Sequence, residues 1–282
     1  MKFITSIRKG YSMKSKFIYS LIVVILIAGL TTFINVRFNR IERALNSKNC
    51  TIEKVGFFRN NITPISFNNI KRIAHGAGGF NQQAVTNSIE AIESNKDKFD
   101  LFEIDFNFTK DNRLVCTHDL DKESTYQDFI NHRSKNRNFT PMVFEELTEW
   151  LDKNPTKSIV TDVKDDNLKA LTYIKEHYKE YASRVIPQIY CIEEYEPVKK
   201  LGYKNIIFTL YRNGNSDATI VSSIRGKNLY AVTIYKGRAP FLATAITELG
   251  IPVYAHTVNS NEVFDFLREN YGVTEIYTDF LY

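Results

Sequence analysis

Cysteine is scarce in this 282-residue sequence, which holds Cys50, Cys116 and Cys191 and no other. Their odd number and wide spacing exclude the disulfide framework that holds many small secreted domains together. Cys116 stands in an apolar run beside His118, a position that would also suit a nucleophile. Because that run has the pattern of a strand, we expect a buried free thiol instead.

An excess of one charge is missing from most of the chain, although the formal net charge is +5. Residues 1–43 hold eight of the 37 Lys and Arg residues, and Glu42 is the single acid among them. The remainder holds 29 basic and 31 acidic residues and is therefore close to neutral. A nucleic-acid partner is not indicated, because the basic excess flanks a hydrophobic segment.

Long hydrophobic runs are limited to one. Residues 17–36 contain no charge and are bounded by Lys16 and Arg37. Twenty helical residues, at a rise of about 1.5 Å each, cross a hydrocarbon core of about 30 Å. We interpret this run as an uncleaved transmembrane anchor, because a signal peptide would have a shorter apolar region and a cleavage site of small residues.

The expected anchor is one of four segments into which we divide the chain. Residues 1–16 would form a short basic cytoplasmic terminus, residues 17–36 the membrane span and residues 37–70 a polar juxtamembrane linker. Residues 71–282 would form the folded domain. Since basic residues lie on both sides of the span, the positive-inside rule contributes little. With no second span, we place the folded domain on one side of the membrane, outside the cytoplasm.

From Arg72 onward, β-like runs alternate with helical patterns. Eight strands in alternation with helices over about 210 residues predict an α/β fold, a (β/α)₈ TIM barrel. A doubly wound sheet of the same elements is the alternative, because periodicity alone does not distinguish the two. The expected strands are residues 72–76, 101–106, 158–164, 185–190, 205–211, 229–235, 251–257 and 275–279.

One connection is too short for this alternation. Residues 110–112 alone separate the run FEIDFNFT from the run RLVCTHD. A crossover between parallel strands needs a dozen residues or more, so these two runs must form a tight hairpin. We therefore expect an inserted strand after the second barrel strand, which returns His118 toward the barrel mouth. Residues 120–143 would follow as an irregular insertion over that mouth.

Polar side chains stand where the expected strands end, and barrel active sites are built at these ends. His75 ends the first strand. Glu103 and Asp105 share one face of the second, as Asp162 and Lys164 do at the end of the third, because side chains two apart in a strand point to the same side. Three carboxylates and one ammonium would converge, and such hard oxygen ligands suit Mg²⁺ or Ca²⁺.

The five histidines divide into two groups. His75 and His118 are placed to exchange a proton across a reacting centre, and His256 ends the seventh strand, where it would line the pocket. His132 and His177 are expected to be solvated.

The segment between the first two strands begins with the turn GAGG at residues 76–79. Its glycines would allow the backbone to approach a phosphate closely. Further along, we interpret Asn87 as the N-cap of a helix and Glu90 as the residue that closes a capping box. Both would then have a local structural role.

The order of these motifs resembles the glycerophosphodiester phosphodiesterase family, part of the phosphatidylinositol-specific phospholipase C-like superfamily of (β/α)₈ barrels. The resemblance extends over about residues 73–280. It rests on AHG at 74–76, NSIEA at 87–91, FEIDFNFTKDNRLVCTHD at 102–119, TDVK at 161–164, HTVN at 256–259 and IYTDF at 276–280.

The resemblance implies a role for each candidate residue. His75 and His118 would serve as general acid and base, and one divalent cation would be held by Glu103, Asp105 and Asp162. Lys164 would lie near the phosphate, with His256 at the substrate. A neighbouring alcohol hydroxyl would attack phosphorus and give a cyclic phosphate that water then opens.

This sequence differs from the family at three positions. Gly76, Asp162 and His256 stand where the family has an arginine that clamps the phosphate, a glutamate and a tryptophan. The Asp-x-Lys pattern at residues 162–164 is closer to sphingomyelinase D relatives on the same fold. We therefore expect a remodelled pocket in a membrane-anchored, metal-dependent phosphodiesterase, acting on a glycerophosphodiester or a (lyso)phospholipid-type diester.

Two alternatives stay open. One is a phospholipase D-like lyase that releases the cyclic phosphate. The other is an inactive barrel that binds an envelope phosphodiester or a protein partner, for which Gly76 is the main support. Retention of two histidines and three acids counts against the inactive barrel. The expected partners are one Mg²⁺ or Ca²⁺ ion, the diester and the membrane, with no nucleic acid and no identifiable protein partner.

Overall fold

The computed structural model describes residues 22–29, 65–135 and 137–281, together with Ser20, Thr32 and Ile62. Residues 22–29 are helical and exposed. Among the described residues, no helix combines the length and the apolar character that a membrane crossing requires. The expected N-terminal segment 1–16, and much of the expected anchor and linker, lie outside the described residues. The anchor therefore stays a prediction.

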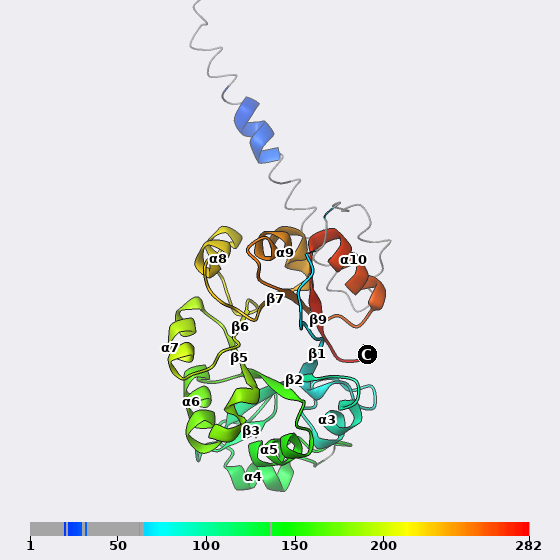
Figure 1. Ribbon diagram of the computed structural model, residues 1–282, viewed down its shortest axis with the longest axis vertical. Helices are drawn as coiled ribbons and strands as arrows, with labels where there is room; N and C mark the ends of the chain where they lie inside the picture. The colour runs from blue at the N-terminus through cyan, green and yellow to red at the C-terminus, as the bar shows by residue number, and fades with distance from the viewer. Residues whose placement is uncertain are drawn as a thin grey trace, which may run out of the picture.

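Eight parallel strands form a closed ring, which confirms the predicted TIM barrel over the doubly wound alternative (Figure 1). Each strand pairs with the next around the ring, and β1 pairs with both β9 and β2, which closes the sheet. The barrel strands are β1 (Ile73–Ala74), β2 (Leu101–Phe108), β4 (Ser158–Val163), β5 (Val185–Ile189), β6 (Ile207–Thr209), β7 (Ala231–Tyr235), β8 (Val253–His256) and β9 (Glu275–Thr278).

Helices surround this ring on its outer side (Figure 1). Several begin at a Ser, Thr or Asp whose side chain accepts a hydrogen bond from the first turn, as Asp166 does from Lys169 N–H. Apolar residues at helical spacing turn one face of each helix toward the sheet. The helices are α3 (Ile89–Asn95), α4 (Tyr126–His132), α5 (Phe144–Lys153), α6 (Asn167–His177), α7 (Tyr195–Lys200), α8 (Asp217–Ile224), α9 (Ala239–Thr247) and α10 (Asn261–Tyr271).

The barrel interior is filled by one side chain from every strand, in the order Ile73, Leu101, Val160, Ile186, Ile207, Ala231, Tyr254 and Tyr277. The alternate residues of β2, such as Phe102 and Ile104, belong to the outer core beneath the helices. Farther along the strands, the inward-facing positions become polar, as at Glu103 and Asp162. The period of two therefore collects polar groups at the carboxyl end of the barrel.

The predicted hairpin is confirmed. β3 (Leu114–Cys116) pairs antiparallel with the end of β2, and Asn112 takes a positive φ of 61° in the turn. Cys116 is a buried free cysteine in the core, as predicted, and its burial raises the pKa of the thiol well above the usual value.

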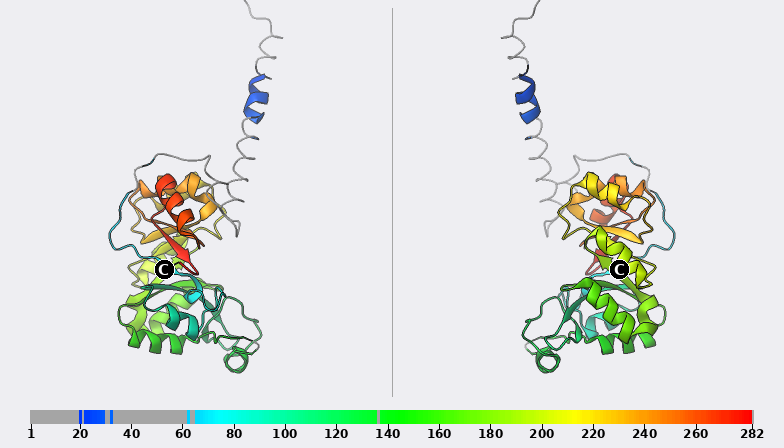
Figure 2. Two further views of the ribbon diagram at one scale, coloured as in Figure 1. Left: turned by 90° about the vertical axis from the view of Figure 1, so that its right-hand side faces the viewer. Right: turned by 90° about the vertical axis from the view of Figure 1, so that its left-hand side faces the viewer.

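The expectation that residues 120–143 are irregular is wrong in part, because they contain α4. Its residue Phe129 packs against Val115 and Val143 in a small separate cluster. A single buried aromatic, in a helix of seven residues, leaves too short a periodic pattern to recognise in the sequence. Figure 2 shows the insertion (teal to green) projecting from one end of the barrel.

Candidate active site

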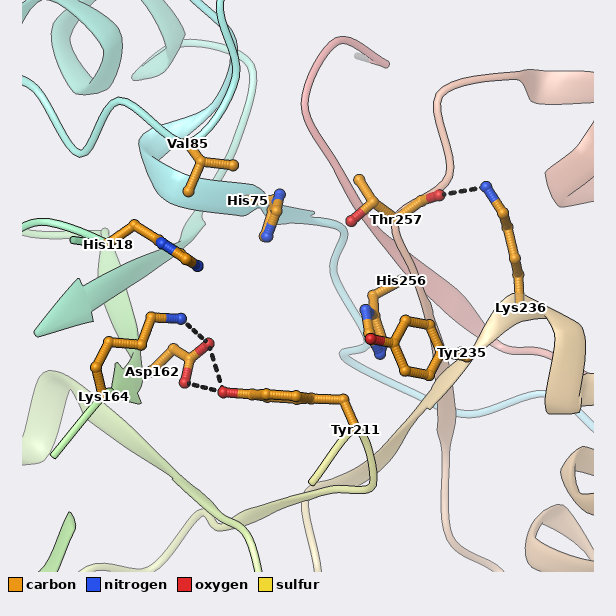
Figure 3. Close-up of a pocket in the computed structure, with 10 residues that line it drawn as sticks. All are labelled: His75, Val85, His118, Asp162, Lys164, Tyr211, Tyr235, Lys236, His256 and Thr257. Carbon is orange, nitrogen blue, oxygen red and sulfur yellow. Dashed lines mark hydrogen bonds and ion pairs between the residues drawn. The ribbon is translucent and has the colours of Figure 1, made fainter. Parts of the chain in front are cut away.

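The carboxyl ends of the strands surround a cavity of about 650 Å³. His75 and His118 approach it from one side, with Asp162 and Lys164 below them, and Tyr235 and His256 lie opposite (Figure 3). Five of the seven candidate residues thus line this one cavity: His75, His118, Asp162, Lys164 and His256. His132 and His177 are exposed, as expected.

The other two candidates, Glu103 and Asp105, are buried beside Asp162. One carboxylate oxygen from each of the three acids lies within 4.8 Å of the others. The Gly76 N–H donates to Glu103 Oε2 at 2.7 Å, while Glu103 Oε1 has no hydrogen-bond partner among the described residues. Lys164 Nζ lies 2.5 Å from Asp105 Oδ1 and 2.8 Å from Asp162 Oδ2.

The electrostatics of this cluster favour a cation. Burial and the charge of Asp105 raise the pKa of Glu103 to about 8. The pKa of Asp162 is lowered despite burial, because Lys164 is close by and tyrosine hydroxyls donate to its carboxylate. One ammonium offsets three crowded carboxylates only in part. The donor set, with Glu103 Oε1 unpartnered, therefore fits a hard divalent cation such as Mg²⁺ or Ca²⁺.

His75 lies in a 3₁₀ turn (His75–Ala77) and not in the strand, which ends earlier than predicted. Its Nδ1 is 2.8 Å from Asp279 Oδ1, and Asp279 Oδ2 accepts a hydrogen bond from Asn259 Nδ2 at 2.7 Å. Burial lowers the pKa of His75, but the hydrogen bond to Asp279 and the charge of Glu103 outweigh it and raise the pKa to about 9.

His118 follows β3 and is held by its backbone. Asn107 Nδ2 donates to the carbonyl oxygens of Thr117 and His118, at 2.8 and 3.2 Å. The imidazole Nδ1 is 3.0 Å from Asp119 Oδ1, and 53% of the side chain is exposed. The hairpin therefore fixes where the ring stands and leaves its other nitrogen accessible from the cavity.

The expected capping role of Asn87 is wrong. Its side chain donates to Asp105 Oδ2 at 2.7 Å and accepts from Asp105 N–H at 2.9 Å, so it positions a candidate metal ligand. Ser88 is the N-cap of α3, and Glu90 accepts hydrogen bonds from Thr140. Asn and Ser are both favoured N-caps, so the sequence did not distinguish the adjacent residues.

The tyrosines of the site were not among the predicted residues. The hydroxyls of Tyr190 and Tyr211 donate to Asp162 Oδ1 at 2.5 and 2.8 Å. Tyr235 lines the cavity beside Lys236, whose Nζ donates to the carbonyl oxygen of Thr257 at 3.0 Å. The sequence did contain a signal for them. Each tyrosine stands two residues after an inward-facing position near the end of its strand, so its side chain is expected to point inward as well.

Gly76 occupies a position that excludes a side chain. Its φ is +55°, and an added Cβ would lie 2.4 Å from Val85 Cα. The glycine found where the resembling family has arginine is therefore a requirement of the local backbone. An arginine side chain therefore cannot stand at this position.

We expect Gly76→Ala to lower the free energy of unfolding by more than Gly250→Ala. Both glycines have positive φ, which costs an L side chain about 1–2 kcal/mol. At Gly250 nothing lies within 4 Å of an added Cβ, whereas at Gly76 the backbone of Val85 must also move. Thermal denaturation of the two variants measures the difference, and equal losses would contradict the steric argument.

Similarity to known proteins is found at the level of the fold. No protein-family model and no curated protein matches the chain. Solved structures do match, among them a glycerophosphodiester phosphodiesterase from Parabacteroides distasonis, with a TM-score of 0.60 and 19% identity, over 74% of this chain and 92% of that one. The Thermotoga maritima glycerophosphodiester phosphodiesterase gives 0.58 and 17%, over 76% and 96%.

A third match is an Oleispira antarctica phosphodiesterase in complex with the product sn-glycerol-3-phosphate, with a TM-score of 0.57 and 14% identity, over 74% of this chain and 93% of that one. At such identities the likeness establishes the fold. The resemblance predicted from the sequence is confirmed at this level: the chain has the (β/α)₈ fold of the glycerophosphodiester phosphodiesterases of known structure.

Proposed function

We propose that this protein is a metal-dependent phosphodiesterase that cleaves a glycerophosphodiester or a (lyso)phospholipid-type diester. The observation that carries the proposal is that His75 and His118 line one cavity together with Asp162, a member of the buried acidic cluster. A module that only binds its ligand has no use for two imidazoles beside a cation site. The activity named for the solved structures of this fold supports the same reaction class.

His75 is suited to be the general acid. Its pKa of about 9 keeps the imidazole protonated at neutral pH. Because Asp279 accepts the Nδ1 proton, Nε2–H is the group left to donate toward the oxygen of the leaving alcohol.

His118 is suited to be the general base. Asp119 is positioned to accept the Nδ1 proton, which leaves the lone pair of Nε2 to take the proton of the attacking hydroxyl. That hydroxyl belongs to a neighbouring alcohol of the substrate in the cyclising route, and to water in direct hydrolysis. Both routes use the same pair of histidines.

The negative charge that develops on the phosphoryl oxygens would be offset by a bound cation and by Lys164. Glu103, Asp105 and Asp162 would hold the cation, which supplies Lewis acidity toward the non-bridging phosphoryl oxygens when bound. Lys164 brings a second positive charge to the edge of the cavity, and Tyr190 and Tyr211 hold Asp162 in place.

The assay that tests this function incubates the purified full chain with glycerophosphodiesters and lysolipids, with and without added Mg²⁺ or Ca²⁺. Phosphorus NMR identifies the products. A phosphomonoester supports the diesterase, an accumulating cyclic phosphate establishes the lyase, and uncleaved substrates establish the inactive barrel.

We also propose that residues 17–36 anchor the chain with its N-terminus in the cytoplasm and the barrel outside, which would place the site near lipid headgroups. The 20-residue apolar run supports this arrangement. Protease added to spheroplasts should then degrade the barrel domain. A domain that stays fully protected, while an outer-surface control protein is cleaved, would contradict the orientation.

A further inference from the structure

We propose that the cavity wall opposite His75 and His118 binds an uncharged, hydroxyl-rich ring as the substrate headgroup, the chemical class of inositol and the sugars. Tyr211, Tyr235 and His256 form this aromatic wall. The inference rests on the proposed function and assigns one half of the diester. In net hydrolysis the P–O bond to the ring breaks, water supplies the new oxygen on phosphorus, and the ring oxygen leaves with a proton.

The aromatic wall begins at the acidic cluster. The Tyr211 hydroxyl donates to Asp162, and its ring extends from there toward His256 (Figure 3). The ring centroids of Tyr211 and His256 are 6.1 Å apart, and those of Tyr235 and His256 are 4.4 Å apart. A group bonded to a phosphorus atom held near the cluster would therefore lie directly against these rings.

Aromatic faces suit the flat side of a carbon ring. The face of an aromatic ring carries partial negative charge, which attracts the weakly positive C–H groups of a saturated ring. Tyr235 is 42% exposed, so much of its surface is open to contact. A cavity of about 650 Å³ lies within the usual size range of small-molecule sites and has room for a phosphodiester with such a ring.

His256 provides a polar contact within this apolar surface. Its Nε2 is buried and has no hydrogen-bond partner among the described residues. Burial and the nearby His75 lower the pKa of His256 to about 3, so the imidazole is neutral and carries one donor and one acceptor nitrogen. A ring hydroxyl can satisfy such an atom, whereas a trimethylammonium group has neither a donor nor an acceptor to offer.

The charges around the aromatic wall disfavour a cationic headgroup. Among the described residues that line the cavity, Asp162 is the sole carboxylate, and Lys164 and two tyrosines already contact it. Lys236 lines the same side, and the Arg212 guanidinium lies 5.0 Å from the Tyr211 ring centroid. Choline or ethanolamine would meet these positive charges with no free lining carboxylate to balance them, while an uncharged ring meets no such penalty.

The test compares three glycerophosphodiesters that differ in the headgroup alone: inositol, cyclohexanol and choline. The full chain is assayed at a fixed divalent-cation concentration, and released glycerol phosphate is measured for all three. We expect kcat/KM for the inositol diester to exceed that of each of the others by about tenfold or more. Equal or higher kcat/KM for choline would overturn the inference, and equal values for cyclohexanol would overturn the role of the hydroxyls.

Two variants separate stacking from hydrogen bonding. Tyr235→Ala should lower kcat/KM for both ring substrates relative to choline. His256→Phe keeps an aromatic ring and should lower the inositol-to-cyclohexanol ratio toward one. Phe241→Ala, which removes a comparably exposed aromatic (37%) from α9, is the matched control and should keep the wild-type ratios. Unchanged ratios in both pocket variants would refute the role of the aromatic wall.

Failure of the inference and failure of the proposed function give different results. Cleavage of all three diesters without a preference for inositol would leave the phosphodiesterase in place and refute the headgroup assignment. Cleavage of none of them, with cation present, would refute the phosphodiesterase and the headgroup assignment together.

Discussion

His118→Ala should lower kcat for diester cleavage by about 10²–10⁴-fold, the usual contribution of a positioned general base. The imidazole lines the cavity on the same side as His75, and 53% of the side chain is exposed, so its removal leaves no hole in the core. Thermal denaturation should therefore give a melting temperature close to that of the wild type. Added imidazole should restore part of the activity, because the vacated space opens to solvent.

His132→Ala is the matched control for this variant. His132 is an exposed histidine that ends α4, in the insertion that follows His118, and its Nδ1 is hydrogen-bonded to the carbonyl oxygen of Asp128. It should keep wild-type turnover. Full activity of His118→Ala would remove His118 from the mechanism, whatever the control shows.

Glu103→Gln should reduce cation affinity and turnover together. The amide keeps the shape of the side chain but removes one of the three negative charges of the cluster. Loss of a residue that only orients a metal ligand typically costs 10–100-fold in affinity, so loss of a ligand charge should cost at least about 100-fold. The rise in melting temperature on addition of Mg²⁺ or Ca²⁺ measures the affinity, because a ligand that binds the folded state alone stabilises it.

The stability of this variant without cation distinguishes metal loss from misfolding. Burial and the charge of Asp105 raise the pKa of Glu103 to about 8, so without cation the carboxyl is largely protonated near neutral pH and a neutral amide replaces it at little cost. Glu103→Gln in EDTA should therefore melt no lower than the wild type in EDTA. Glu123→Gln, at a surface glutamate paired with Lys110, should retain both cation affinity and turnover. Wild-type turnover that survives EDTA would show that the metal assignment is wrong.

Local pattern was enough to predict most of the barrel. Alternation of strands and helices, the short hairpin after β2 and the inward parity of Glu103, Asp105 and Asp162 are all properties of neighbouring residues. Since parallel strands of a closed barrel end at one face, these local signals also predicted which side chains would meet. The cavity lining agrees with that expectation for His75, His118, Asp162, Lys164 and His256.

The contacts that tune these residues could not be predicted in the same way. Asp279, which raises the pKa of His75, lies 204 residues away along the chain and becomes its neighbour because β9 pairs with β1. Asn87 was assigned to a helix cap because an asparagine before a helix fits that local rule. Its actual hydrogen-bond partner is Asp105, which comes close to Asn87 only when the segment after His75 folds against β2.

The sequence by itself determined the barrel, the hairpin and the identity of the acids and histidines, because strand parity and connection length act over a few residues. The tertiary structure alone decided that tyrosines just after β5 and β6 hold Asp162, that Asp279 supports His75, and that Gly76 cannot bear a side chain beside Val85. These contacts arise from ring closure and close packing, which join residues that have no relation in the linear order.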